Sequence, residues 1–154
     1  AAREDAKFVL HVHTDAGIAV ASTKEGLLPI SQHALIALPN LAYHDYEGIA
    51  LDLDERERLV QDLGDKKALM LWNHGTLAVG ETAAQCWMMI FYLERACAIQ
   101  VMASAQGREH LRIAPEDAIE TVKEQQAIAS GVGAMLAWPG CLRKLDRESP
   151  GYDS

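Results

Sequence analysis

The sequence predicts an α/β sandwich, in which strands and helices alternate along one chain of 154 residues. Two observations indicate this class. Short apolar runs of strand length recur between longer segments whose apolar residues have helical spacing. In addition, the apolar runs at residues 68–72 and 77–80 flank an Asn-His-Gly sequence, so the second run is expected to pair back on the first as a hairpin. We therefore expect a single domain over residues 1–154.

Each expected element has a local basis in the sequence. Strands are expected at residues 8–10, 41–43, 68–72 and 77–80. Helices are expected at residues 16–21, 31–36, 55–63, 82–105, 116–130 and 141–146. Residues that favour the N-cap position precede or open several of these helices, namely Thr14 or Asp15, Ser31, Asp54 and Thr82. Pro115 suits the first turn of the helix at 116–130, and Pro139 is expected to lead into the short tail helix.

The longest expected helix, at residues 82–105, is apolar nearly all round. Its expected core stripe follows i, i+3, i+4, i+7 spacing, and one carboxylate interrupts it. The stripe consists of Trp87, Ile90, Phe91, Glu94, Cys97, Ala98 and Val101. Because such a helix can pack on the sheet with one face and on another subunit with the other, we expect a homo-oligomer.

Composition restricts the classes of partner. The chain is 49% hydrophobic and 23% charged, which suits a domain with a substantial core. Its formal net charge of −8 disfavours nucleic acid or an anionic membrane as the main partner. The longest apolar run, residues 86–93, is too short to span a bilayer, and no secretory pattern is seen. We expect a cytoplasmic protein whose three cysteines form no disulfide framework.

Three histidines are candidate metal ligands. His11 and His13 follow the apolar run at residues 8–10, and residues i and i+2 of an extended chain point to the same face. His74 follows the apolar run at residues 68–72. If the two strands are neighbours, three imidazoles meet with a coordination position left open, as in a catalytic zinc site. The alternative is that the histidines are packed and hydrogen-bonded without a metal.

Four motifs, in this order, resemble the class II aldolase/adducin family. They are His-Val-His-Thr at 11–14, Gly-Leu-Leu-Pro-Ile-Ser-Gln-His at 26–33, Ala-Tyr-His-Asp-Tyr-Glu-Gly at 42–48 and Asn-His-Gly at 73–75. The resemblance is strongest over residues 7–106 and implies a three-layer α/β/α sandwich with a mixed central β-sheet, often assembled as a tetramer. In metal-dependent members, the His-x-His pair and the Asn-His-Gly histidine bind a divalent ion, usually zinc. Those positions here are His11, His13 and His74.

The resemblance implies a metal-dependent lyase or epimerase acting on a small hydroxy-carbonyl substrate, of sugar-phosphate or keto-acid type. The metal would stabilise an enediolate, and aldol cleavage, epimerisation and decarboxylation all remain open. In related aldolases, a neighbouring subunit contributes a tyrosine that is proposed to protonate the departing carbon. The expectation here is that His33 takes that place, because imidazole titrates near neutral pH. The alternative is an interface histidine.

Two other functions remain open from the sequence. Adducins keep the fold as an oligomerising head domain without the metal chemistry, so the chain could be a non-catalytic module. Family members also have a substantial region before the His-x-His strand, and this sequence resembles a chain that lacks it. That region normally supplies an anion-binding segment and an acidic residue, so an inactive metal-binding fragment is the third hypothesis. The string around His44 and Asp45 is interpreted as loop architecture or a subunit contact, rather than as a second metal site.

Overall fold

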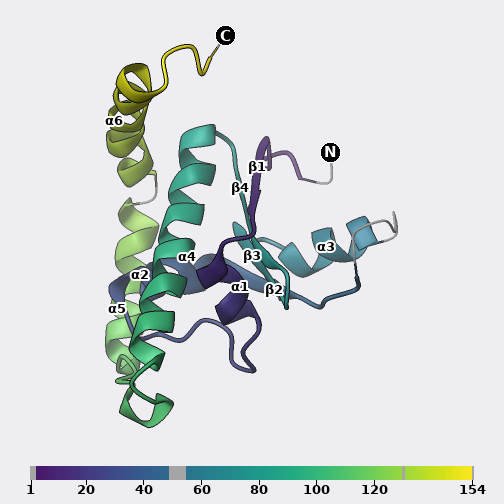
Figure 1. Ribbon diagram of the computed structural model, residues 1–154, viewed down its shortest axis with the longest axis vertical. Helices are drawn as coiled ribbons and strands as arrows, with labels where there is room; N and C mark the ends of the chain where they lie inside the picture. The colour runs from purple at the N-terminus through teal and green to yellow at the C-terminus, as the bar shows by residue number, and fades with distance from the viewer. Residues whose placement is uncertain (1–2, 49–54, 130, 154) are drawn as a thin grey trace.

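A mixed sheet forms the centre of the computed structural model, which describes residues 3–48, 55–129 and 131–153 (Figure 1). The sheet has four strands in the order β1-β4-β3-β2. They are β1 (Phe8–Val12), β2 (Leu41–His44), β3 (Ala68–Leu71) and β4 (Gly75–Gly80). β4 pairs antiparallel with both β1 and β3, whereas β2 pairs parallel with β3. The expected mixed sheet and the β3–β4 hairpin are both confirmed.

Helices cover both faces of this sheet. They are α1 (Asp15–Ala21), α2 (Gln32–Ala37), α3 (Glu55–Leu63), α4 (Ala83–Ser104), α5 (Glu116–Ala129) and α6 (Val132–Glu148). Short 3₁₀ helices occur at Leu38–Asn40 and Arg108–His110. α4 lies along one face with α1 and α2 beside it, and α3 lies on the opposite face (Figure 1). The three-layer α/β/α architecture is therefore confirmed.

Side-chain alternation along the central strand builds two separate cores. Every residue of β3 is buried. Met70 belongs to the core cluster that contains Leu93 of α4, whereas its neighbour Leu69 packs with Leu63 of α3. Because successive side chains of a strand point to opposite faces, one short strand serves both layers. An apolar run without alternation, as at residues 68–71, is what this position requires.

Several helices begin at the residues that the sequence predicts. The hydroxyl oxygens of Thr14, Ser31 and Thr82 accept hydrogen bonds from the backbone N–H three residues later, at 2.9, 3.1 and 3.2 Å respectively. Each bond satisfies a donor that the first helical turn leaves without an intrahelical partner. Thr14, rather than Asp15, is therefore the cap of α1. The expected cap at position 54 lies outside the described residues.

The buried face of α4 differs from the predicted one. The buried residues are Cys86, Ile90, Leu93, Ala96, Cys97 and Gln100. Phe91 and Val101, which were expected in the core, are 40% and 41% exposed. The helix is apolar nearly all round, so spacing alone could not identify the face that meets the sheet. By length and composition α4 could also cross a membrane, but here it packs along the sheet as the main helix of one layer.

The prediction for the C-terminal helix was wrong. α6 begins at Val132, after Gly131 with φ of 85°, and Pro139 lies inside it instead of at its start. Inside a helix, proline removes one backbone hydrogen bond and its ring clashes with the carbonyl of the residue four positions earlier, which favours a kink or a break. The ring centroids of Trp138 and Trp87 lie 6.1 Å apart, so this part of α6 is held against α4. Tertiary packing therefore keeps the helix continuous across the proline.

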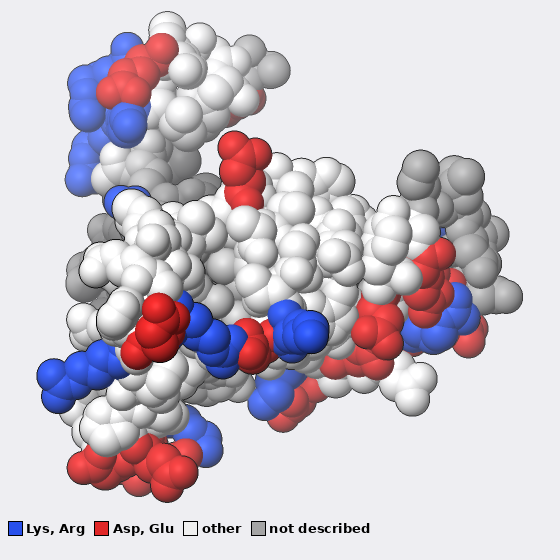
Figure 2. Space-filling model, turned by 60° about the horizontal axis from the view of Figure 1, so that its bottom comes forward, with Lys and Arg blue, Asp and Glu red and all other residues white. Residues whose placement is uncertain are grey.

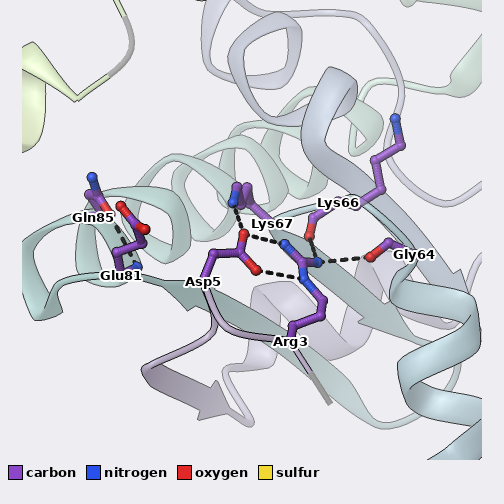
Figure 3. Close-up of polar contacts among 7 residues, drawn as sticks. All are labelled: Arg3, Asp5, Gly64, Lys66, Lys67, Glu81 and Gln85. Carbon is purple, nitrogen blue, oxygen red and sulfur yellow. Dashed lines mark hydrogen bonds and ion pairs between the residues drawn. The ribbon is translucent and has the colours of Figure 1, made fainter. Parts of the chain in front are cut away.

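A polar cluster fastens the segment before β1 to the turn between α3 and β3 (Figure 3). The Arg3 guanidinium donates to the carbonyl oxygens of Gly64 at 2.9 Å and Lys66 at 2.5 Å. It also binds the Asp5 carboxylate, which receives a further bond from the Lys67 ammonium. These bonds from Arg3 and Lys67 hold the pKa of Asp5 well below its usual value. The cluster thereby helps to place β1 at the edge of the sheet.

Charges of opposite sign lie close together on the surface. Acidic and basic side chains alternate along the face drawn in Figure 2, with an uncharged area above them. Ion pairs of this kind join Arg58 to Glu47 and Arg108 to Glu25. Such exposed pairs contribute little to the free energy of unfolding, since water and salt screen them. The stability of the fold therefore depends mainly on the two cores.

Candidate metal centre

Three imidazoles converge at one end of the sheet. In the β1–β4 pairing His11 lies opposite Leu77, so the end of β1 is beside the start of β4. His13 follows β1 directly, and His74 lies in the turn between β3 and β4. Ring centroids are 4.5 Å apart for His11 and His13, 5.0 Å for His11 and His74, and 4.7 Å for His13 and His74. One ring nitrogen of each lies within 4.8 Å of the others.

The tautomer of His11 follows from its hydrogen bond. Its Nδ1 lies 2.9 Å from the backbone carbonyl oxygen of Thr76. A carbonyl can only accept, so Nδ1 carries the hydrogen and Nε2 of the neutral ring keeps a free lone pair. The Nε2 atoms of His13 and His11 are 2.7 Å apart, so His13 donates to His11 when both rings are neutral. A backbone carbonyl behind one ring nitrogen is the usual arrangement for a metal-ligating histidine.

The turn that carries His74 depends on its two flanking residues. Asn73 has φ of 56°, in the left-handed region, and its N–H donates to the carbonyl oxygen of Ala21 at 3.0 Å. Asn73, and not Gly75, therefore has the positive φ of this turn. Gly75 is needed for space, since a Cβ there would lie 2.6 Å from the carbonyl oxygen of Val12 and 3.0 Å from the His13 ring. The absence of a side chain at position 75 therefore lets the hairpin approach β1.

The electrostatic environment favours neutral imidazole at position 74. Burial lowers the pKa of His74, and the positive charges that His11 and His13 carry when protonated lower it further. Neutral imidazole is the form that binds a metal. Within the part of the chain that the structure describes, no cysteine, aspartate or glutamate joins the three histidines. Three imidazole nitrogens with open positions fit a catalytic type of divalent-metal site.

A hollow lies beside this centre. Its lining comprises Ala21, Ser22, Thr23, Lys24, Asp45, Tyr46, Trp72 and Asn73. Tyr46 connects the hollow with the histidines, because its ring centroid is 6.2 Å from that of His74. The hollow thus offers hydroxyl, amide, carboxylate and ammonium groups next to the candidate metal ligands. A larger hollow between β4, α4 and α6 contains none of the three histidines.

His33 does not join the three histidines within one subunit. It lies half-buried on the first turn of α2, with its ring centroid 5.6 Å from that of Tyr92 on α4. No contact between His33 and the histidine cluster is found among the described residues. If His33 carries a proton in the reaction, it must do so at the site of a neighbouring subunit.

His44 has a different role from the one predicted. It ends β2 and is only 3% exposed, so it is not part of a loop. Its Nδ1 is 2.7 Å from Asp62 Oδ2, and its Nε2 is 3.7 Å from Glu55 Oε1, both on α3. Asp45 is exposed and is not its partner. The histidine therefore links the sheet to α3, a contact that sequence spacing did not indicate.

Sequence reasoning also missed the polar contacts behind the histidines. Glu94 of α4 accepts hydrogen bonds from the hydroxyls of Thr14 and Thr76. Thr14 follows His13, and Thr76 supplies the carbonyl that binds His11. One feature of the sequence could have indicated these contacts, namely Glu94 as the single carboxylate in an otherwise apolar helical stripe.

A family model and individual protein sequences both match this chain. The family model for the class II aldolase and adducin N-terminal domain matches residues 1–101. A protein of Caulobacter vibrioides named "Putative aldolase class 2 protein" is 65% identical over 152 residues, covering 99% of this chain and 59% of that protein. Alpha-adducin of Mus musculus is 49% identical over 114 residues, covering 72% of this chain and 15% of that protein.

Among solved structures, an aldolase II superfamily protein from Pseudomonas syringae has the same fold. It is 47% identical, with a TM-score of 0.93, and the match covers 99% of this chain and 61% of that chain. The present chain thus spans about three-fifths of the length of this structure and of the Caulobacter relative.

Proposed function

Because the chain belongs to the class II aldolase and adducin family, we propose that it forms the metal-binding part of an aldolase-type enzyme. The observation that carries this proposal is the convergence of His11, His13 and His74 at the end of the sheet. We propose Zn²⁺ as the ion, because three imidazoles with an open position are a donor set that suits it. The proposed substrate is a small hydroxy-carbonyl compound of sugar-phosphate or keto-acid type.

Each histidine has a defined part in this proposal. The three rings hold the ion, which when bound supplies Lewis-acid chemistry to a substrate carbonyl. Thr76 orients His11 through its carbonyl, so the Nε2 lone pair faces the other two histidines. Partial burial keeps His74 in the neutral form that can bind. The chain therefore contributes preorganised nitrogen donors on rigid elements.

The hollow beside the centre supports a polar substrate. Ser22 and Thr23 bring hydroxyl groups to its lining, and Lys24 brings a cation that can pair with a phosphate or carboxylate. Tyr46 places a phenol between this hollow and His74. A substrate with several hydroxyls and one anionic group matches these side chains better than an apolar substrate does.

Proton transfer by His33 is proposed to occur between subunits of a homo-oligomer, which we propose is a tetramer. Exposed apolar side chains on α6 support association, including Met135 at 67% and Leu136 at 71% exposed. His33 lies on α2, which packs against α4 and α5. An oligomer that brings α2 of one subunit to the histidine cluster of the next would complete the site.

One observation favours a second candidate, a non-catalytic oligomerisation module. Alpha-adducin is 49% identical to this chain over 114 residues, a similarity as high as that to the Pseudomonas syringae structure. This candidate requires assembly but no metal-dependent turnover. Since the chain covers 59% of its Caulobacter relative, a metal-binding piece that needs further sequence for turnover is also consistent with the fold.

Turnover distinguishes these candidates. The protein, loaded separately with Zn²⁺, Mn²⁺ and Co²⁺, is assayed against phosphorylated and non-phosphorylated hydroxy-aldehydes, hydroxy-ketones and keto-acids. The proposal expects carbon–carbon cleavage or epimerisation that is lost with a chelator and in His74→Ala. Assembly without metal-dependent turnover, both in this chain and in a version extended to the length of its relatives, would favour the non-catalytic module.

A further inference from the structure

Glu94 is a carboxylate in the middle of a helix that otherwise packs apolar side chains against the sheet. Each of its two carboxylate oxygens accepts a hydrogen bond from a different residue. Oε2 accepts a hydrogen bond from the Thr14 hydroxyl, and Oε1 accepts one from the Thr76 hydroxyl. The partners lie 80 and 18 residues away along the chain, so only the fold brings them to one side chain.

Each threonine is linked to one histidine of the cluster. Thr14 follows His13 directly and also caps α1, because its hydroxyl oxygen accepts from the Gly17 N–H at 2.9 Å. Thr76 accepts the His11 Nδ1–H with its backbone carbonyl oxygen at 2.9 Å. The Thr76 side chain is directed toward α4, and its carbonyl binds the imidazole. One carboxylate thus ties together Thr14, which follows His13, and Thr76, whose carbonyl binds His11.

The space around Glu94 is fitted to this contact. A Cβ on Gly17 would lie 2.9 Å from Glu94 Oε1 and 2.9 Å from the Thr14 hydroxyl oxygen, so glycine leaves the room that the carboxylate needs. Burial, with a smaller effect of the Glu94 charge, raises the pKa of the nearby Cys97 thiol to about 12. The carboxylate therefore lies beside the apolar core.

Among the described residues, no lysine or arginine side chain lies within ion-pair distance of Glu94. A carboxylate beside an apolar core without a cationic partner costs free energy unless it is otherwise compensated. The two hydroxyls supply part of this compensation, and a divalent cation held by the three histidines would supply opposite charge.

We propose that Glu94 is a positioning residue for the metal centre, acting through Thr14 and Thr76 on His13 and His11. This inference rests on the proposed function, since it assumes that the three histidines bind a divalent ion. Glu94 does not touch the ion. It holds Thr14 and Thr76 in place beside His13 and His11, and its negative charge would strengthen the binding of a cation by these rings.

The test measures metal affinity rather than turnover. Zn²⁺ dissociation constants are measured by competition with a chromogenic chelator for the parent protein, Glu94→Gln and Glu116→Gln. The last variant removes the same charge at an exposed position in the first turn of α5. We expect Glu94→Gln to weaken Zn²⁺ binding by about 10-fold to 100-fold, as is typical when a group behind a metal ligand is lost. Glu116→Gln is expected to bind like the parent.

A second pair of variants separates positioning from folding. Thr76→Val removes the hydroxyl and keeps the backbone carbonyl, whereas Thr76→Ser keeps both groups. Weakened binding in Thr76→Val with recovery in Thr76→Ser supports the proposal, as does an altered visible spectrum of bound Co²⁺ in Glu94→Gln. Parent-like Zn²⁺ affinity in both Glu94→Gln and Thr76→Val would overturn it and leave the proposed function intact. No metal binding by the parent would overturn both.

Discussion

The Nδ1–H of His11 donates to the backbone carbonyl oxygen of Thr76 at 2.9 Å, across the pairing of β1 with β4. This bond joins β1, which carries His11, to β4, which begins directly after His74. It sets the tautomer of His11 and directs Nε2 toward His13 and His74 before any ion arrives. The orientation of the His11 ring is therefore fixed by the pairing of β1 with β4.

The first prediction concerns the close approach of the hairpin to β1. Gly75→Ala would place a Cβ 2.6 Å from the Val12 carbonyl oxygen, so the strands must separate. We expect a loss of about 1–3 kcal/mol in the free energy of unfolding, together with weaker metal binding. Urea unfolding measures the first effect. Gly133→Ala in α6 is the control, because its Cβ would make only ordinary contact with Met88 at 3.8 Å. Equal stability of the two variants would contradict the prediction.

The second prediction concerns pH in the metal-free protein. The pKa of His74 in the folded state lies below its ordinary value of 6.5, so the unfolded chain binds a proton more readily. The corresponding stability is present above pH 6.5 and is lost as the pH falls through the lower pKa of the folded state. Urea unfolding from pH 8 to pH 5 checks this. His74→Gln should show a shallower dependence, and an unchanged dependence would contradict this cause.

The third prediction concerns the loop between α1 and α2. Gln100 is 4% exposed, accepts from the Leu28 N–H at 2.7 Å and donates to the Gly26 carbonyl oxygen at 2.8 Å. Gln100→Leu leaves both backbone groups without these partners, so we expect a cost of about 1–3 kcal/mol. Thermal unfolding measures the loss, with the exposed Gln106→Leu as control. Similar melting temperatures for both variants would show that Gln100 does not hold the loop.

The fourth prediction tests transfer of a proton by His33 between subunits. His33→Ala and His74→Ala are each expected to lack turnover. If His33 serves a neighbouring site, mixed oligomers regain about a quarter of the parent activity, since some sites then combine an intact His74 with a neighbour's His33. Unfolding and refolding the two variants together produces the mixture. Refolding each variant alone is the control, and no recovery in the mixture would indicate that His33 has no role at a neighbouring site.

Local signals predicted much of the fold. The strand at residues 68–71 was readable because a strand buried on both faces is uniformly apolar. Thr14, Ser31 and Thr82 were readable as caps because their contacts reach only three residues along the chain. The face of α4 and the start of α6 were not readable. Both depend on how apolar surfaces pack together in the folded protein. Because α4 is almost uniformly apolar, its sequence does not show which of its faces packs against the sheet.

Some features of the candidate site could likewise be predicted from the sequence, and others could not. His11 and His13 could be paired from their spacing alone, and His74 from its place after a second strand. The hydrogen bonds that Thr14 and Thr76 donate to Glu94, and the contact of His44 with Asp62, could not be predicted. These contacts join separate elements, so they exist only after the sheet and helices have packed. The candidate ligands could be found from the sequence pattern, whereas the residues that contact their neighbours could be found only from the fold.

The most direct test of the central claim is the metal content of the purified protein. Elemental analysis at neutral pH, after incubation with Zn²⁺ and removal of free ion, is compared for the parent, His74→Ala and His110→Ala. His110 lies in the 3₁₀ helix at Arg108–His110, outside the histidine cluster. The account predicts about one ion per chain in the parent and in His110→Ala, and a loss of the ion in His74→Ala. A parent protein that retains no zinc, manganese or cobalt after reconstitution would contradict it.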